Sequence, residues 1–224
     1  MNEAVLEVKN IERVKTKTLF FITKRVFDFS LALLFFIMLL PVTIVIYIAI
    51  KAEDHGPLFY IQKRTGKNGK VFNMYKYRSM SVVTERNGRK LTHDERVTKI
   101  GRFIRKTSLD EFPQIINILK GEMSFIGPRP WMTIYYDNFT EAQKKRVSVL
   151  PGITGLAQAS GRNGLNVFEK INYDIKYVEN ASILFDLKIV FMTIKTVLKK
   201  ESVDLIQESI EDEINDLKNQ NKGE

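Results

Sequence analysis

One long apolar segment dominates the pattern of hydrophobic and polar positions along this chain. Residues Phe29 to Ile50 include no charged side chain, and a proline, Pro41, lies inside the run. As a helix, these 22 residues would extend over roughly 33 Å. The hydrocarbon core of a bilayer is about 30 Å thick. The pattern therefore predicts a helix that enters a membrane.

The flanks of this run predict how the helix lies in the membrane. Basic residues precede and follow it, and segments rich in Lys and Arg tend to stay on the cytoplasmic side. Pro41 removes one backbone donor, leaves the carbonyl of Ile37 without its helical partner and favours a kink. The arm from Phe29 to Leu40 would be about 18 Å long, close to half of the hydrocarbon core. We therefore predict a re-entrant hairpin broken at Pro41. A straight or mildly kinked single span is the alternative, because membrane helices tolerate proline.

Beyond the apolar run, alternating apolar and polar residues predict a small β-hairpin. Leu58 to Arg64 and Val71 to Tyr77 alternate with a period of two, and the segment between them contains Asn68-Gly69, a strong hairpin signal. Residues 81–95 are polar, and we expect them to form a mobile loop.

Three further segments have helical periodicity. From Val97 to Lys106 an apolar face alternates with basic residues, which suits either a helix on a membrane surface or an ordinary core-facing helix. Ile183 to Leu198 is strongly apolar, but Asp186 and two lysines argue against a membrane span, so an interfacial or core helix is expected. Residues 201–224 have apolar positions at helical spacing, suited to packing on this chain or on a partner.

Charge is distributed unevenly. The chain has a formal net charge of +9; residues 201–224 hold eight acidic and two basic residues, so residues 1–200 carry +15. A basic body suits an anionic membrane surface and phosphate-bearing substrates. No helix-turn-helix, zinc-finger or RNP pattern is present, so nucleic acid is not expected as a partner. The lack of cysteine excludes disulfides and thiolate chemistry, and His55 and His93 are too isolated to suggest a metal site.

Two adjacent carboxylates, Asp110 and Glu111, are the first candidates for chemistry. They precede a helix expected from Gln114 to Leu119. One interpretation is helix capping, because Ser108 and Glu111 match a capping box, Asp110 could itself be the cap and Pro113 suits a first turn. The other is catalysis, because a helix N-terminus keeps a carboxylate ionised and available as a nucleophile or a Mg²⁺ ligand. The two interpretations are compatible.

Two loops carry candidate arginines. Arg129 lies between Pro128 and Pro130, which restrict the backbone around it and suit a fixed fork for phosphate; a simple turn is the alternative. Residues 151–164 are rich in glycine, which permits close approach of a ligand, and Arg162 within them is a second candidate for phosphate or base. No Walker motif or dinucleotide fingerprint is present.

Taken together, these elements resemble the monotopic phosphoglycosyl transferases, the bacterial sugar transferases that load a phosphosugar onto a polyprenyl phosphate. The match runs in order from about residue 24 to residue 200, and the ordered set is far more specific than any single motif. The matching segments are Lys24 to Asp28, Gln62 to Gly66, Lys76 to Met80, Arg105 to Glu111, Ser124 to Pro130 and Pro151 to Gly155.

The resemblance implies which residues act. It implies that Asp110 and Glu111 are catalytic and hold Mg²⁺, and that three arginines bind the phosphates or the nucleotide: Arg105, Arg129 and Arg162. Members of the family often have Ser-Pro at the tip of the hairpin, where this chain has Leu40-Pro41. This chain therefore lacks one hydroxyl that could cap the freed carbonyl.

The resemblance also implies an α+β, mostly helical fold. We expect four parts: a polar lead-in at 1–23, the re-entrant membrane hairpin at 24–54, a catalytic domain with interfacial helices at 55–200 and an acidic helix or tail at 201–224. The first and the last part lie outside the resemblance, which implies no function for them. The form is expected to be the small one, without a long N-terminal polytopic domain. The catalytic domain is expected on the cytoplasmic face of the bacterial inner membrane, among its lipids, and a homo-oligomer is compatible with this organisation.

The expected reaction follows from the same resemblance. A sugar 1-phosphate would pass from a UDP-sugar to polyprenyl phosphate, normally undecaprenyl phosphate, through a phosphosugar held on Asp110, with UMP as the leaving group. This would be the first membrane step of capsule, exopolysaccharide or glycoconjugate assembly. The alternative is a membrane-anchored adaptor or scaffold, which would use the basic body and the acidic tail to bind partners.

Overall fold

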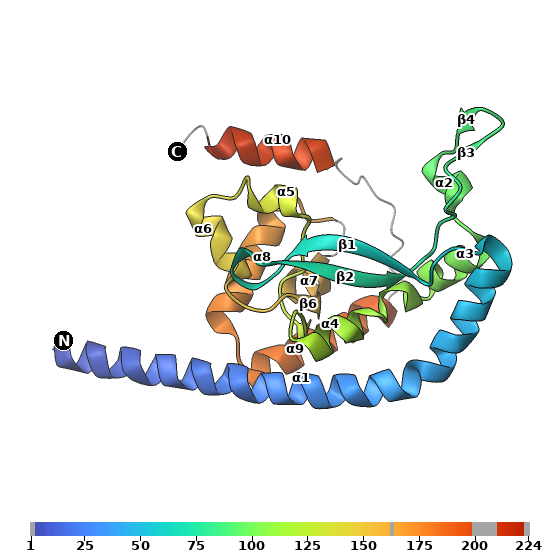
Figure 1. Ribbon diagram of the computed structural model, residues 1–224. Coiled ribbons are helices and arrows are strands. Elements are labelled where there is room, and N and C mark those ends of the chain that lie inside the picture. The colour runs from blue at the N-terminus through green and yellow to red at the C-terminus, as the bar shows by residue number, and fades with distance from the viewer. Residues whose placement is uncertain (1–2, 162–163, 199–209, 222–224) are drawn as a thin grey trace.

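The computed structural model describes residues 3–161, 164–198 and 210–221. In these ranges the chain is mostly helical, with three small two-stranded sheets, in agreement with the predicted α+β class. A long N-terminal helix lies along the base of the molecule, and the other elements pack above it (Figure 1). The helices and strands are α1 (Glu3–Asp54), β1 (Phe59–Thr65), β2 (Val71–Tyr77), β3 (Glu85–Arg86), β4 (Arg89–Lys90), α2 (His93–Arg96), α3 (Lys99–Lys106), α4 (Gln114–Lys120), β5 (Ser124–Ile126), α5 (Thr133–Tyr136), α6 (Glu141–Lys144), β6 (Gly152–Thr154), α7 (Leu156–Gly161), α8 (Val167–Asn180), α9 (Ile183–Leu198) and α10 (Ile210–Asn221).

Helix α1 contains the whole apolar run. It is one helix of 52 residues with Pro41 inside it, so the predicted break into two arms at Pro41 is not confirmed. The helix instead curves towards its C-terminal end (Figure 1). The Thr43 hydroxyl donates to the carbonyl of Leu39 at 2.9 Å and shares a 2.5 Å hydrogen bond with the hydroxyl of Tyr77 on β2. Such bonding to the carbonyl four residues earlier bends helices, and proline adds to the effect.

The apolar surface of α1 is largely uncovered by protein. Within the described residues, the segment Lys17–Asp54 is the one helix long and apolar enough to cross a membrane. Only 11% of its apolar stretch of 18 residues is buried by the rest of the protein. A core helix of a soluble protein would be buried instead. Because a contiguous exposed apolar surface of this size marks an interaction site, α1 indicates association with a membrane.

The predicted β-hairpin is confirmed. Strands β1 and β2 pair antiparallel from Phe59↔Tyr77 to Thr65↔Val71, and Asn68 and Gly69 in the turn both have positive φ, as the Asn-Gly signal requires. Phe72 and Met74 of β2 pack on α1 and α4 in one buried cluster. The hairpin therefore covers α4, the helix that the Asp-Glu pair precedes.

One expectation for the middle of the chain needs correction, and a second is met as a helix. Residues 81–95 were expected to form a loop, but they contain the short pair β3 and β4 and helix α2, which begins with a capping box between Thr92 and Glu95. In α3, Ile104 is fully buried whereas Phe103 is 56% exposed. The apolar residues of α3 therefore divide between the protein core and the surface, because the helix is covered on one side only.

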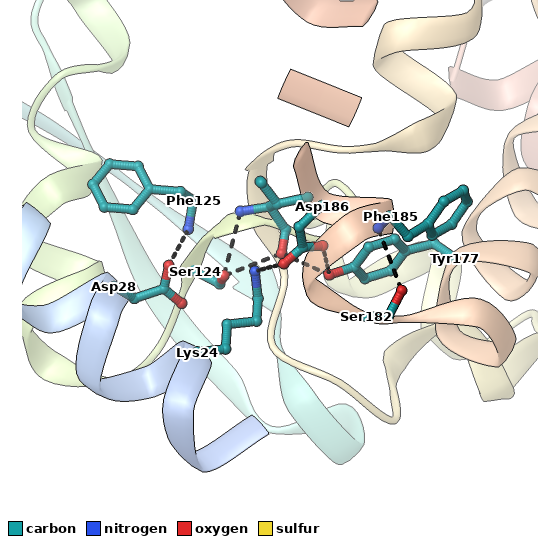
Figure 2. A network of polar contacts seen from close by, with 9 residues as sticks. Lys24, Asp28, Ser124, Phe125, Tyr177, Ser182, Phe185 and Asp186 are labelled. Atoms are coloured by element: carbon teal, nitrogen blue, oxygen red, sulfur yellow. Dashed lines mark hydrogen bonds and ion pairs between the residues drawn. The ribbon is translucent and has the colours of Figure 1, made fainter. Parts of the chain in front are cut away.

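A buried polar network joins α1 to the rest of the protein (Figure 2). Lys24 binds Asp186 of α9 at 2.5 Å, and the Tyr177 hydroxyl of α8 contacts the same carboxylate at 2.9 Å. Asp28 accepts a long hydrogen bond from the backbone N–H of Phe125 on β5. The charge of Asp186 made a membrane span unlikely for this segment. In the structure, that charge binds Lys24 and so joins α9 to α1.

The acidic C-terminal segment packs on the protein itself where the structure describes it. Ile214 and Leu217 of α10 are buried against aromatic and aliphatic residues of α5, α8 and the segment after α5. Glu213 accepts hydrogen bonds from the hydroxyl of Tyr135 and from Lys170. Of the two positions that the sequence allowed, the structure therefore selects packing on this chain. Residues 201–209 lie outside the described ranges.

Candidate active site

Asp110 and Glu111 lie in a tight 3₁₀ turn, Leu109–Glu111, between α3 and α4. Ser108 before the turn adopts a left-handed conformation, with φ 56°, and its side chain makes no capping bond. Helix α4 begins after Pro113, again without a side-chain cap. The capping interpretation is therefore wrong. A non-glycine residue in this conformation is uncommon, and such residues concentrate at functional sites.

The Glu111 carboxylate is held by two cations from distant parts of the chain. Lys76 on β2 and Arg129 after β5 each bind the same oxygen, Oε1, at 2.8 Å. Burial by itself would raise the pKa of Glu111, but Arg129 and Lys76 overcome it and lower that pKa to about 2. Glu111 is therefore a permanent negative charge at neutral pH, and a weak base.

Asp110 has a different environment. Among the residues that the structure describes, none makes an ion pair with it. Burial raises the pKa of Asp110, Lys76 and Arg105 oppose that rise, and the neighbouring charge of Glu111 adds to it. The expectation that a helix terminus holds this carboxylate ionised is not met, because Asp110 lies in the 3₁₀ turn and not at the start of α4. Apart from a hydrogen bond from its own backbone N–H, its oxygens are available to a substrate.

The three predicted arginines differ in how they relate to the carboxylates. Arg129 joins Glu111 directly, and its side chain is still 46% exposed. Arg105 stands nearby, binds the Ser79 hydroxyl through Nε at 2.8 Å and lowers the pKa of Asp110 against the larger effect of burial. Arg162 lies outside the described residues.

Two further basic residues, which the motifs did not single out, belong to the site. Lys76 is one, and Arg64 of β1 is the other: it donates to the carbonyl of Pro130 at 3.4 Å and to Gln62 Oε1 at 2.6 Å. Burial and then Arg129 lower the pKa of Arg64. The alternation of strand β2 could have identified Lys76, because Lys76 lies on the same face of the strand as the buried Phe72 and Met74. A basic residue on the inward face of a strand needs a partner.

Charge defines the chemistry that this site suits. Two carboxylates meet four cationic side chains, so the site has an excess of positive charge and favours an anion such as phosphate. No cluster of three or more His, Cys, Asp or Glu occurs among the described residues. Mg²⁺ is commonly held by one or two protein carboxylates together with substrate phosphates. The oxygens of Asp110, and Oε2 of Glu111, which is not engaged by Lys76 or Arg129, fit that donor set.

Comparison with known proteins identifies the family of this chain. The profile of a family described as bacterial sugar transferase matches residues 19–200, which include every residue of the site. The chain belongs to the bacterial sugar transferase family. The family that the ordered motifs indicated is thereby confirmed.

Three relatives show how the chain compares with other sugar transferases. The uncharacterized sugar transferase EpsL of Bacillus subtilis is 42% identical over 183 residues, covering 81% of this chain and 90% of that protein. The exopolysaccharide production protein ExoY of Sinorhizobium fredii is 40% identical over 193 residues, covering 79% and 85%. The UDP-glucose:undecaprenyl-phosphate glucose-1-phosphate transferase of Escherichia coli is 42% identical over 183 residues, covering 76% of this chain and 39% of that longer protein.

The pairing of Lys76 with Glu111 predicts a pH-dependent contribution to stability. Lys76→Met should cost about 1–3 kcal/mol at neutral pH, because it leaves a largely buried carboxylate with one cation fewer. A lowered pKa stabilises the fold fully above the unfolded value, near 4.5, and this contribution is lost as the pH falls towards 2. Thermal unfolding of detergent-solubilised protein should therefore show a gap between wild type and Lys76→Met that is constant above about pH 5 and narrows below it.

Lys63→Met is the matched control, since Lys63 is an exposed residue of the other strand of the same hairpin. It should unfold like the wild type at every pH. A gap between wild type and Lys76→Met that stays constant down to pH 3 would contradict the assigned partner of Glu111.

Proposed function

We propose that this protein transfers a sugar 1-phosphate from a UDP-sugar to polyprenyl phosphate, normally undecaprenyl phosphate, giving polyprenyl diphosphate sugar and UMP. The observation that carries the proposal is the pairing of an unengaged Asp110 with a Glu111 whose charge is balanced by Lys76 and Arg129. Relatives named as undecaprenyl-phosphate galactose phosphotransferase and UDP-glucose:undecaprenyl-phosphate glucose-1-phosphate transferase support the substrate classes. The relatives named for exopolysaccharide production suggest the kind of polymer that the product begins.

In the first step, a carboxylate oxygen of Asp110 attacks the β-phosphorus of the UDP-sugar. A bond forms between that oxygen and phosphorus, the bond from phosphorus to the bridging oxygen breaks, and UMP leaves with the electron pair. The phosphosugar is then held on Asp110. Arg129 and Lys76 neutralise the negative charge on the phosphoryl oxygens during the transfer. Stabilising this charge is the main requirement of phosphoryl transfer.

In the second step, a phosphate oxygen of the lipid attacks the same phosphorus. The bond to Asp110 breaks, the carboxylate is restored, and the polyprenyl diphosphate sugar departs. With its pKa lowered to about 2 by Arg129 and Lys76 against the effect of burial, Glu111 is too weak a base to take a proton from the acceptor. Its proposed role is to hold the two cations in place and to bind metal.

Mg²⁺ is the proposed cofactor. Asp110 and Glu111 would hold it together with the substrate phosphates, and it would supply charge neutralisation to the diphosphate when bound. The other proposed roles belong to five side chains. Asp110 is the nucleophile, Arg129 and Lys76 bind phosphate, and Arg105 and Arg162 are further phosphate or nucleotide ligands.

The proposal predicts a covalent label on Asp110. Wild-type protein incubated with a panel of UDP-sugars carrying ³²P in the β-phosphate should retain label with one or more of them, and added undecaprenyl phosphate should discharge it. Asp110→Asn should take no label and should release UMP at least about a thousandfold more slowly, because the replacement amide is not a nucleophile. The measurements are autoradiography of the denatured protein and a UMP-release assay.

Asp94→Asn is the control, because it removes a fully exposed carboxylate of α2 and should leave labelling unchanged. EDTA-treated wild-type protein, run in parallel, should take label only after Mg²⁺ is restored. Label that persists in Asp110→Asn would refute the nucleophile, whereas UMP release that is insensitive to EDTA would refute the metal.

The membrane geometry is the second part of the proposal. We infer that α1 enters the membrane and returns to the cytoplasmic face, so that the catalytic residues meet the lipid phosphate there. Basic residues on both sides of the apolar run favour this topology, and the curvature of α1 is compatible with it.

Cysteine accessibility tests this topology cleanly, because the chain has no natural cysteine. Asn10→Cys and Lys67→Cys, one on each side of the apolar run, should both react with an impermeant maleimide only after spheroplasts are lysed. Ile44→Cys is the control: its position is 59% exposed in the protein, yet lipid should protect it in both conditions. Labelling of Asn10→Cys in intact spheroplasts, with Lys67→Cys protected, would establish a single span instead.

A further inference from the structure

Arg146 is a fully buried arginine that no step of the proposed reaction uses. It lies in a 3₁₀ turn after α6, and its side chain is 1% exposed. Its Nε and one terminal nitrogen donate to the same oxygen, Oδ2, of Asp174 on α8, at 3.0 and 2.6 Å. Asp174 is equally buried. The pair therefore joins two elements behind the site, out of reach of water.

Arg146 also contacts the arginine loop, residues 127–130, and two aromatic rings that follow it, Trp131 and Phe139. Its terminal nitrogen donates to the backbone carbonyl of Arg129 at 2.9 Å. The guanidinium also lies over the ring of Trp131, 4.1 Å from the centroid. Arg146 thus contacts the residue that binds Glu111 and the residue two positions beyond it.

Stability alone does not account for this pair. Burying two charges costs most of what their attraction returns, and apolar replacements of similar volume are often neutral or stabilising. The second oxygen of Asp174, Oδ1, is buried without a hydrogen-bond partner in the described part of the chain. A pair chosen only for stability would satisfy that oxygen. What the pair does achieve is a fixed donor aimed at the Arg129 carbonyl.

The first half of the loop has no need of such a donor. The Gly127 N–H donates to the carbonyl of Thr154, and the Pro128 carbonyl accepts from Gly152, both at 2.9 Å, so backbone contacts with the β6 segment hold it. At Arg129 these sheet-like contacts end, and Arg146 supplies the next one. The Arg129 backbone is thereby held where its side chain reaches Glu111 at 2.8 Å.

We propose that Arg146, itself oriented by Asp174, is a positioning residue for Arg129 that sets the affinity of the site for the diphosphate of the nucleotide. This inference rests on the proposed function, because it assigns Arg129 to phosphate binding. Arg146 touches no reacting atom. It acts through the backbone of Arg129.

The test separates positioning from stability by replacing the buried pair with apolar residues, in the double variant Arg146→Met/Asp174→Leu. Its thermal midpoint is expected to stay close to that of the wild type, while its dissociation constant for UDP, measured by equilibrium dialysis, rises about tenfold or more. Arg146→Lys is the second variant: it keeps the buried charge but lacks the fork that reaches both partners, so it should also weaken UDP binding.

The decisive arm adds Arg129→Ala to each protein. If Arg146 acts through Arg129, its replacement should weaken UDP binding in the wild-type background and have no further effect once Arg129 is gone. An equal loss in both backgrounds would overturn the proposal, as would unchanged UDP affinity in Arg146→Lys and the apolar variant.

A surface pair gives the matched control. Lys145 and Glu179 join the same two elements at 2.6 Å but are about half exposed, so Lys145→Met/Glu179→Gln should bind UDP like the wild type. Weakened binding in this control would show that any link between the two elements matters and would overturn the specific role of Arg146. A wild-type protein that neither binds UDP nor releases UMP would instead refute the proposed function itself.

Discussion

A partly buried carboxylate requires compensating charge, and in this protein Glu111 obtains it from two segments that are far apart in the sequence. Lys76 arrives on the inner face of the β-hairpin, and Arg129 arrives on the loop after β5. Each partner needs its own scaffold: α4 lies under the hairpin, and α8 lies behind the loop. The β-hairpin and the loop after β5 therefore support one three-residue charge cluster, with Asp110 next to it in the sequence.

The same logic extends from the site to the membrane helix. Lys24 of α1 meets Asp186 of α9, and Arg25 of α1 donates to the carbonyls of Ile118 and Leu119 at the end of α4. The helix that carries the apolar run is thus bonded directly to the helix that follows the Asp-Glu pair. The proposed reaction, between a soluble sugar nucleotide and a membrane-bound lipid phosphate, needs a site at a fixed height above the bilayer. Polar contacts between α1 and α4 are a physical means of setting that height.

Sequence reasoning succeeded where the information is local or additive. The period of two predicted the hairpin within one residue, the apolar run predicted the exposed helix, and the spacing at Ile183 to Leu198 predicted α9. It failed where a local rule competed with long-range contacts. Capping at Ser108 and Glu111 was a sound local expectation, but the Glu111 side chain is drawn away by two cations that the local sequence does not contain. The predicted break at Pro41 is not confirmed: α1 is a single curved helix in which the Thr43 hydroxyl donates to the carbonyl of Leu39.

The sequence by itself determined the family, the membrane helix, the β-hairpin and the two carboxylates. Composition, periodicity and ordered motifs can be read along the chain without knowing which distant residues come into contact. Only the tertiary structure decided that Glu111 is paired while Asp110 is not, that Lys76 and Arg64 belong to the site, and that Arg146 supports Arg129 from behind. These are relations between residues separated by 17 to 66 positions, such as Arg146 and Arg129 or Arg64 and Pro130. Their energies depend on distance and burial, which exist only once the chain has folded.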